Sequence, residues 1–540
     1  MNVTGPRIDD VLAAGRDEVM PIAAGALLLT FAALLYCSMH GWLLLYGDAV
    51  AHLHIARRIF DSRNPGWSQL GGVWLPLPHL LLVPFVQKMD WWRSGLAGAL
   101  PSMVSYVVSV ACLFMLARFI MPHRWALVAT LFFAINPGLL YLSTTAMTEP
   151  LFLALVLGSV LLLATWERAL EQGNAPPANA RLIWAGVVLV AAVYTRYDGW
   201  IIAAVAWLLV VWALTRSRAW KNGRTAFLIF TLMLVAAPLG WFAYNAHFYH
   251  DPLDFMRGPY SAKAIELRTT PPGSFHYPGW HNVRLAAMYY AKTAQVDAAA
   301  GRAGLVVMLL AIAGVWLVLR RRIAVAGPLM LLWVPLAFYV YSVAYGSVPI
   351  FIPQWWPHSY YNARYGMEML PAFALFAAFA LAMADQWLAA RWPISRQLLL
   401  PMVVVLIAVN TALLFYKKPL VLQEALVNSA TRIGFETALA SDLEMLPAGE
   451  PILMYNSDHV GALQQAGIPL KQTVNEFDRD GWQAALADPA THAAYVVALD
   501  GDAVAAAVKQ HPEGLQETTI LCASGQPCAR LYVSRVYRSR

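Results

Sequence analysis

Two side chains that can accept or donate a proton lie about one helical turn apart early in the chain. Asp48 and His52 are four residues apart, so they share a face if this segment is a helix. A carboxylate beside an imidazole can take a proton from a hydroxyl or help to hold a divalent metal ion. If a helix starts at Asp48, the same carboxylate could instead be its N-cap, and the two roles are compatible.

Other charged side chains stand at the edges of apolar segments. Glu149 lies between Thr148 and Pro150, and Arg196 and Asp198 share a short turn between two apolar runs. Glu149 could cap the helix that follows it, and Arg196 could pair with Asp198 alone. A charge at the centre of a membrane helix costs about 2.5 to 3.5 kcal/mol, which favours a functional role for these groups.

Arg364 follows Tyr360, Tyr361 and Asn362, just before a late apolar segment. A guanidinium at that position can hold a phosphate oxygen with two donors, whereas the alternative is that it only extends toward the membrane interface. Further candidates for substrate binding lie in the long segments 47–99, 245–302 and 346–364. They are His79, Arg257, Lys263, His358 and Tyr361.

The composition indicates what kind of scaffold positions these groups. The chain has 540 residues, of which 59% are hydrophobic and only 13% are charged. Soluble domains carry about 25% charged residues, so the deficit points to lipid as the solvent. A spanning helix needs roughly 20 apolar residues, and this rule predicts a mainly α, polytopic membrane protein of about eleven transmembrane helices. The predicted spans are 21–41, 100–120, 125–142, 149–166, 182–195, 198–215, 225–246, 303–319, 324–346, 365–389 and 397–416.

Basic residues alternate between the loops and predict the orientation. Positively charged short loops stay in the cytoplasm, so the N-terminus is predicted to be cytoplasmic and the tail extracytoplasmic, in a multi-pass protein of the cell inner (plasma) membrane. The net charge of +7 therefore favours contact with anionic membrane lipids and not with nucleic acid. The long loops 47–99, 245–302 and 346–364 then face outward, as do the candidate site residues.

The chain changes character after residue 416. Residues 1–416 are predicted to form the transmembrane domain, and 417–540 a small α/β extracytoplasmic domain with strands near 451–455 and 494–499 and a helix over 503–510. Cys522 and Cys528 flank a short turn-like spacer in an oxidising compartment. We expect a disulfide between them, and the alternative is two free thiols.

Four features together resemble the GT-C superfamily of integral-membrane glycosyltransferases, which includes protein O-mannosyltransferases and the bacterial lipid A aminoarabinose transferase. They are an aspartate, Asp48, at the end of the first span, a long first outer loop, the run Thr148-Glu149-Pro150, and the run from Asn362 through Arg364 and Tyr365 to Pro371. The resemblance covers most of residues 20–416.

The resemblance implies a polyprenyl-phosphate-linked sugar donor and an inverting transfer to an acceptor hydroxyl on a lipid, a glycan or a protein. Asp48 matches the catalytic aspartate of that superfamily, and Arg364 matches the arginine expected near the lipid phosphate. Many relatives carry a second carboxylate beside the first, where this chain has Ala49 and Val50. A metal site would therefore need His52 as a substitute ligand. The WWDYG signature of oligosaccharyltransferases is absent.

Two other classes of protein are alternatives. A lipid or small-solute transporter, such as a flippase, usually has inverted repeats and broken helices at the membrane midplane, and the sequence shows neither. A structural subunit of the cell envelope would need no carboxylate in its outer loops. The polar residues gather toward one face of the predicted bundle, which favours an enzyme.

Overall fold

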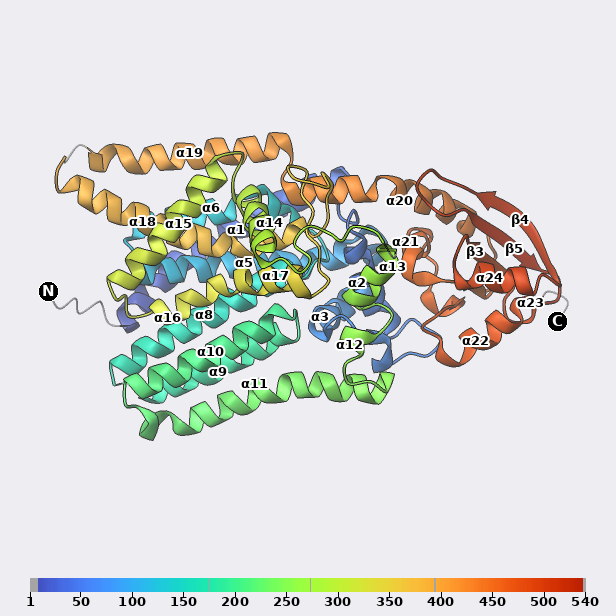
Figure 1. Cartoon of the computed structure of the whole chain (residues 1–540), viewed down its shortest axis with the longest axis horizontal. Coiled ribbons are helices and arrows are strands. Elements are labelled where there is room, and N and C mark those ends of the chain that lie inside the picture. The colour runs from blue at the N-terminus through green and yellow to red at the C-terminus, as the bar shows by residue number, and fades with distance from the viewer. Residues whose placement is uncertain (1–7, 174, 272, 393–394, 538–540) are drawn as a thin grey trace.

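A bundle of long helices carries a small mixed sheet at one end. The computed structural model describes residues 8–173, 175–271, 273–392 and 395–537. The long helices run roughly along the long axis, with α11 (Trp220–Tyr249) and α19 (Ser395–Lys417) on opposite edges (Figure 1). The predicted class, a mainly helical membrane protein with a small C-terminal strand region, is confirmed.

Nine helical segments in the described part of the chain are long and apolar enough to cross a membrane. They are Asp17–Met39 in α1 (Ile8–Met39), α5 (Leu96–Ile120), α8 (Glu149–Glu171), α10 (Asp198–Arg216), α11, α15 (Ala303–Arg320), Ala326–Tyr345 comprising α16 (Ala326–Met330), η2 (Leu331–Trp333) and α17 (Val334–Tyr345), Ala363–Ala389 comprising η3 (Ala363–Met369) and α18 (Leu370–Ala389), and Gln397–Glu444 comprising parts of α19 and α20 (Leu420–Glu444).

Two of the eleven predicted spans do not meet this criterion. The segment 125–142 is divided into α6 (His123–Ala134) and α7 (Pro137–Leu142), because Asn136 caps a new helix that begins at Pro137. The segment 182–195 lies in α9 (Ala175–Val193), whose apolar part Ala178–Val193 is short. The total number of spans stays a prediction.

The first outer loop is largely helical. It contains α2 (Gly47–Arg58), η1 (Trp67–Leu70), α3 (Pro76–Val86) and α4 (Met89–Ser94). α3 begins at Pro76, because prolines are tolerated in the first turn of a helix. The expectation that Asp48 is an N-cap is wrong, since Tyr46 is the N-cap and Asp48 lies inside the first turn of α2.

The second outer loop also forms helices. They are α12 (Asp254–Arg257), α13 (Ala262–Thr269) and α14 (Val283–Ala298). α14 packs against α17 and η3, and so supports the segment that carries Arg364.

The tail starts with the long helix α20, which connects the bundle to the sheet (Figure 1). The strands are β1 (Ile452–Met454), β2 (Thr473–Val474), β3 (Tyr495–Leu499), β4 (Leu515–Leu521) and β5 (Ala529–Ser534), in the spatial order β2-β1-β3-β5-β4. β1 pairs in parallel with β2 and β3, and β5 pairs antiparallel with β3 and β4.

Short helices connect these strands. They are α21 (Asn456–Ala466), η4 (Leu470–Gln472), α22 (Arg479–Ala487), α23 (Pro489–His492) and α24 (Ala503–Gln510). The predicted strands at 451–455 and 494–499 and the predicted helix at 503–510 are therefore present as β1, β3 and α24. The expected Cys522–Cys528 disulfide is also present, and it links the end of β4 to the segment before β5.

Candidate active site

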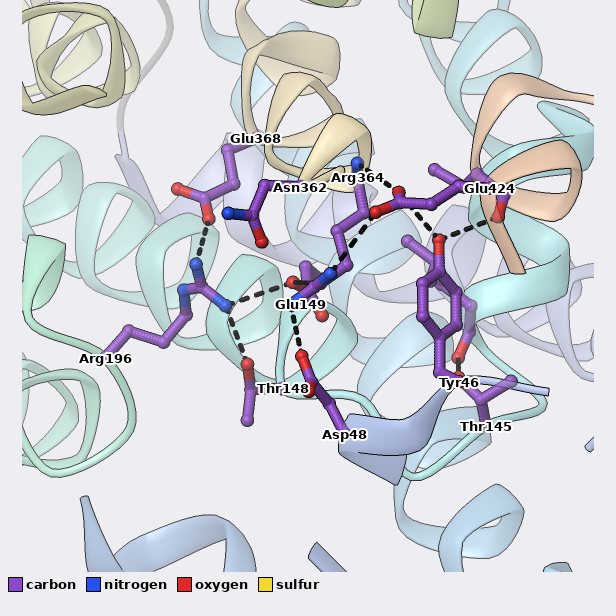
Figure 2. A network of polar contacts seen from close by, with 12 residues as sticks. Tyr46, Asp48, Thr145, Thr148, Glu149, Arg196, Asn362, Arg364, Glu368 and Glu424 are labelled. Atoms are coloured by element: carbon purple, nitrogen blue, oxygen red, sulfur yellow. Dashed lines mark hydrogen bonds and ion pairs between the residues drawn. The ribbon is translucent and has the colours of Figure 1, made fainter. Parts of the chain in front are cut away.

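Five segments that are far apart in the sequence bring charged side chains to one place. The start of α2, the start of α8, the turn before α10, the 3₁₀ helix η3 and the start of α20 surround a network of carboxylates and two arginines (Figure 2). Each carboxylate or arginine stands at or near the end of its helix, so the polar groups meet at one level of the bundle.

Arg364 is the centre of one half of this network. Its Nη2 lies 2.5 Å from Asp48 Oδ2, its Nε lies 3.1 Å from Glu149 Oε1, and its Nη1 lies 3.6 Å from Glu424 Oε1. The Arg364 side chain is only 9% exposed. Three carboxylates therefore hold a buried guanidinium in one orientation (Figure 2).

Arg196 is the centre of the other half. Its Nη1 donates to Thr148 Oγ1 at 2.7 Å and to Glu149 Oε1 at 3.1 Å. Its Nη2 lies 3.2 Å from Glu368 Oε1, and its Nε lies 3.4 Å from Asp198 Oδ2. The predicted pairing of Arg196 with Asp198 is present, but it is one contact of several.

A single oxygen joins the two halves. Glu149 Oε1 accepts from both Arg196 and Arg364, and the Glu149 side chain is fully buried. Thr148 is the N-cap of α8 without a side-chain capping bond, and Glu149 is the first residue of the helix. The start of α8 thus positions Glu149, and the Glu149 carboxylate accepts hydrogen bonds from the two arginines.

Burial and neighbouring charges act in opposite directions on Arg196. Burial lowers the pKa of its guanidinium, but the Tyr339 hydroxyl and the carboxylates of Glu368, Asp198 and Glu149 raise it, and the net result is a pKa well above the ordinary value. The positive charge on Arg196 is therefore permanent, and it offsets part of the negative charge around Glu149.

Asp48 differs from the other carboxylates of the network in its exposure. Its side chain is 41% exposed, whereas those of Glu149 and Glu368 are 0% and that of Glu424 is 2% exposed. A molecule arriving from outside can reach Asp48, but it cannot reach the others without displacing protein.

Comparison with known proteins identifies the fold that carries this network. The family model of dolichyl-phosphate-mannose-protein mannosyltransferases matches residues 92–241. The crystal structure of ArnT from Cupriavidus metallidurans bound to undecaprenyl phosphate superposes with a TM-score of 0.59 at 13% identity, covering 95% of this chain and 98% of that chain. The chain therefore has the fold of ArnT. The apo structure of the same ArnT matches with a TM-score of 0.56 at 14% identity, over 96% of this chain and 98% of the other. A search of curated proteins finds no matching sequence.

His52 and His79 form a buried pair next to Asp48. His52 Nδ1 lies 2.8 Å from His79 Nε2, and the His52 ring lies 4.5 Å from that of Trp74. Burial lowers the pKa of His52 to about 4, although the negative charges of Asp48 and Glu149 oppose this shift. His52 is therefore neutral at neutral pH.

The donor groups do not fit the metal site considered from the sequence. Asp48 Oδ2 is paired with Arg364, and His52 Nδ1 is hydrogen-bonded to His79. Among the residues that the structure describes, no group of three or more histidines, cysteines, aspartates or glutamates could hold a metal ion. The side chains around Asp48 therefore do not fit a bound divalent metal ion.

Three predicted binding residues lie outside the network. Arg257 is 66% exposed on its side chain and lies 3.9 Å from Asp251. Lys263 is exposed on α13, and the exposed His358 ring lies 3.0 Å from the Pro353 carbonyl oxygen. The sequence did not reveal this separation, because it depends on how the outer loops fold.

Tyr361 is closer to the network than these three residues. Its pKa is raised mainly by burial and then by the negative charge of Asp48. The residue precedes η3, and its main chain pairs with that of Phe351. Tyr361 thus belongs to the surroundings of Asp48, although it is not one of the direct partners of Arg364.

Sequence reasoning missed three members of the site. Glu368 in η3 lies 3.2 Å from Arg196 Nη2. Glu424 lies in the tail, where it accepts from the Arg364 main-chain N–H at 3.3 Å and from the Tyr46 hydroxyl at 3.1 Å. Tyr339 lies in a predicted span, accepts from Arg196 at 2.6 Å and donates to Glu368 at 2.7 Å. The available signal was a polar or charged side chain within a largely apolar segment.

Proposed function

We propose that this chain transfers a sugar from a polyprenyl-phosphate donor to an acceptor hydroxyl at the extracytoplasmic face of the inner membrane, with inversion at the anomeric carbon. The observation that carries the proposal is the contact between Asp48 and Arg364. It places an exposed carboxylate, which can act as a base, beside a guanidinium held in a fixed orientation.

The GT-C fold and the match to the mannosyltransferase family support glycosyl transfer from a lipid-linked sugar. The ArnT structure contains undecaprenyl phosphate, a donor-type lipid of the class that we propose for this chain. The membrane-spanning helices supply the apolar surface that a prenyl chain requires, and the charged network lies at the ends of these helices.

Asp48 is proposed as the general base. An acceptor hydroxyl reaches its 41% exposed carboxylate and gives up its proton as the oxygen attacks the anomeric carbon. The new carbon–oxygen bond forms on one face of the sugar while the bond to the phosphate oxygen breaks on the other, so the configuration inverts. The bond electrons leave with the phosphate.

Arg364 is proposed to stabilise the leaving phosphate. Glu149 and Glu424 fix its guanidinium from the buried side, and Nη2 lies beside the exposed Asp48. Donors that are already oriented act most strongly on charge that develops in the transition state. Arg196 lies behind Glu149 and reduces the repulsion that a buried carboxylate would exert on an incoming phosphate.

The remaining outer-loop residues are proposed to meet the substrates before they reach Asp48. Arg257 and Lys263 lie on exposed helices of the second outer loop, where they can contact the donor phosphate or anionic lipid head groups. Tyr361 and His358 are proposed to contact the sugar or the acceptor. His52 and His79, which were expected to bind substrate, are buried against each other and are proposed instead to support the turn of α2 that carries Asp48.

The test combines lipid identification with a mutant. Native mass spectrometry of the purified protein should detect a copurifying polyprenyl phosphate, and that lipid carrying a sugar should serve as donor in transfer assays. Asp48→Asn should lower kcat by about 10²–10⁴-fold, because general-base assistance is lost, while the thermal stability is retained.

Lys471→Gln, an exposed change in the tail, is the matched control and should leave kcat unchanged. Full activity of folded Asp48→Asn protein would show that Asp48 is not the base. Solute uptake into sealed vesicles without any glycosylated product would favour a transporter instead.

A further inference from the structure

Aromatic and basic side chains gather where α1 and α19 end, at the same end of the bundle as the candidate site. α1 ends at Met39 and α19 at Lys417, and both helices contain candidate membrane spans. We call this surface the α1–α19 patch, and its members are Tyr36, His40, Trp42, Phe415, Lys417 and Lys418.

The rings of the patch contact one another across the two helices. The Tyr36 ring lies 4.3 Å from that of His40 and 5.5 Å from that of Phe415, and the His40 ring lies 4.7 Å from that of Trp42. His40 Nδ1 lies 2.8 Å from the Tyr36 carbonyl oxygen, which can only accept, so Nδ1 carries the proton. The rings therefore form one aromatic surface that joins the ends of two spans.

Large apolar side chains next to these rings are freely exposed. Met39 is 84% exposed and Tyr416 is 86% exposed, and each stands at the last turn of a spanning helix. Aromatic side chains at such positions lie at the level of the lipid head groups. A ligand of the α1–α19 patch is therefore expected to arrive from the bilayer.

The two lysines of the patch have no acidic partner. Both are exposed, and neither takes part in an ion pair with any other residue that the structure describes. Lys418 Nζ lies 5.9 Å from the centre of the Trp42 ring. Basic residues in short connections favour the cytoplasmic side, whereas this end of the bundle is predicted to face away from it. Two unpaired positive charges here run against that distribution.

The backbone of Lys418 is left-handed, with a φ of 59°. Its N–H donates to the Phe415 carbonyl oxygen at 3.2 Å, which closes a turn at the end of α19. Glycine is the usual residue in this conformation after a helix, because a Cβ is unfavourable there. A lysine at this position therefore has a backbone cost that glycine would avoid, which favours a role for its charged side chain.

We infer that the α1–α19 patch binds the head group of an anionic phospholipid. Lys417 and Lys418 supply the positive charge for the lipid phosphate, and the aromatic rings lie beside the head group. Met39 and Tyr416 meet the acyl chains, a contact that a free phosphate ion could not make. This lipid is distinct from the proposed sugar donor, whose phosphate is assigned to the buried Arg364.

The patch is connected to the candidate site through the start of α20. Gln423 Nε2 donates to the carbonyl oxygens of Lys417 at 3.1 Å and of Lys418 at 2.7 Å. The next residue, Glu424, contacts Arg364. A lipid that holds the two lysines therefore also holds the turn from which Glu424 reaches the network.

The experiment uses the full-length protein in nanodiscs of phosphatidylcholine that contain a trace of photoreactive phosphatidylglycerol. Peptide mapping should find the label on segments 36–42 and 412–423. Unlabelled phosphatidylglycerol should compete with it, and further phosphatidylcholine should not. The variant Lys417→Gln/Lys418→Gln should weaken this competition by about 25-fold, because each basic residue near a lipid surface contributes about fivefold.

Two other variants serve as controls. Lys509→Gln, an exposed change on α24 of the tail, should label as the parent does. Lys418→Gly removes one charge but suits the left-handed backbone, so competition should weaken about fivefold without a decrease in Tm. A loss of labelling in this variant is then not due to unfolding.

Three results would overturn the inference. They are equal competition by phosphatidylglycerol and phosphatidylcholine, parental labelling of the Lys417→Gln/Lys418→Gln variant, and competition by inorganic phosphate as effective as that by phosphatidylglycerol. Asp48→Asn should label as the parent does even though it loses transfer, so lipid binding is tested separately from the proposed function.

Discussion

At the scale of single residues, the site depends on two arginines that share one carboxylate. Burying a charge is costly unless it is paired, and Glu149 is paired on both sides, with Arg196 and Arg364. Removal of either arginine would leave the buried Glu149 carboxylate paired with only one positive charge. The two cations therefore act as one structural unit, although only Arg364 contacts the exposed Asp48.

Arg364→Lys tests the geometry of this unit. Lysine retains the charge but has no planar set of donors, so it cannot contact Asp48, Glu149 and Glu424 together. We expect kcat to fall at least about 10²-fold, which is the typical loss when one oriented donor to a developing charge is removed. Single-turnover transfer assays measure this, and near-parental rates would show that charge alone suffices.

The buried histidine pair predicts a dependence of stability on pH. Burial lowers the pKa of His52 from 6.5 to about 4. Between these two pH values His52 is therefore protonated in the unfolded chain but neutral in the folded protein. Stability should therefore be constant above about pH 6.5 and fall as the pH decreases toward 4, by on the order of 3 kcal/mol for this residue.

Thermal unfolding in detergent at about pH 7.5 and about pH 4.5 measures this effect. His52→Gln retains a side chain that can hydrogen-bond to His79 but does not titrate, so its Tm should decrease less on acidification than that of the parent protein. Equal decreases in both proteins would assign the acid sensitivity to other groups.

At the scale of elements, η3 positions both ends of the network. It carries Arg364 and Glu368, which contact the two different halves. Its close packing on α14 requires a glycine: a Cβ added at Gly366 would lie 2.4 Å from Asp297 Oδ2 and 2.8 Å from the Ala294 main-chain nitrogen.

Gly366→Ala should therefore move η3 away from α14 and disturb Arg364 and Glu368 together. We expect a loss of stability of about 1–3 kcal/mol, together with a fall in kcat. Gly434→Ala in α20 is the control, since a Cβ there meets nothing within 4 Å, and it should change neither Tm nor kcat appreciably. Unchanged activity of Gly366→Ala would mean that η3 can shift without loss of function.

At the scale of the whole molecule, the tail is part of the candidate site. The predicted boundary at residue 417 places α20 in the tail, yet Glu424 on that helix contacts Arg364. Arg432 of the same helix donates to the carbonyl oxygens of Leu44 and Leu45 at 2.9 Å. The tail thus holds the segment that precedes Asp48.

Glu424→Gln tests whether the tail contributes to activity. The change removes one carboxylate that orients Arg364 but retains the size of the side chain, and we expect kcat to fall by about tenfold through a loss of about 1–2 kcal/mol of charged hydrogen bonding. Glu444→Gln, at the exposed end of the same helix, should have no effect. Equal activities of the two variants would restrict the site to the bundle.

The sequence by itself determined the membrane class, most of the apolar helices, two of the five strands of the tail and most of the charged residues of the network. These follow from local properties: apolar runs long enough to cross a bilayer, alternating basic loops, and charges placed where apolar runs end. Asp48, Glu149, Arg196 and Arg364 could each be selected in this way.

Only the tertiary structure decided which of these residues meet. It joined Asp48 to Arg364 across more than half of the chain, added Glu424 from the tail and Tyr339 from a span, and left Arg257, Lys263 and His358 on the surface. The physical reason is that the contacts depend on how helices pack and where outer loops fold, and distances between residues far apart in a sequence are set by that packing and not by local composition.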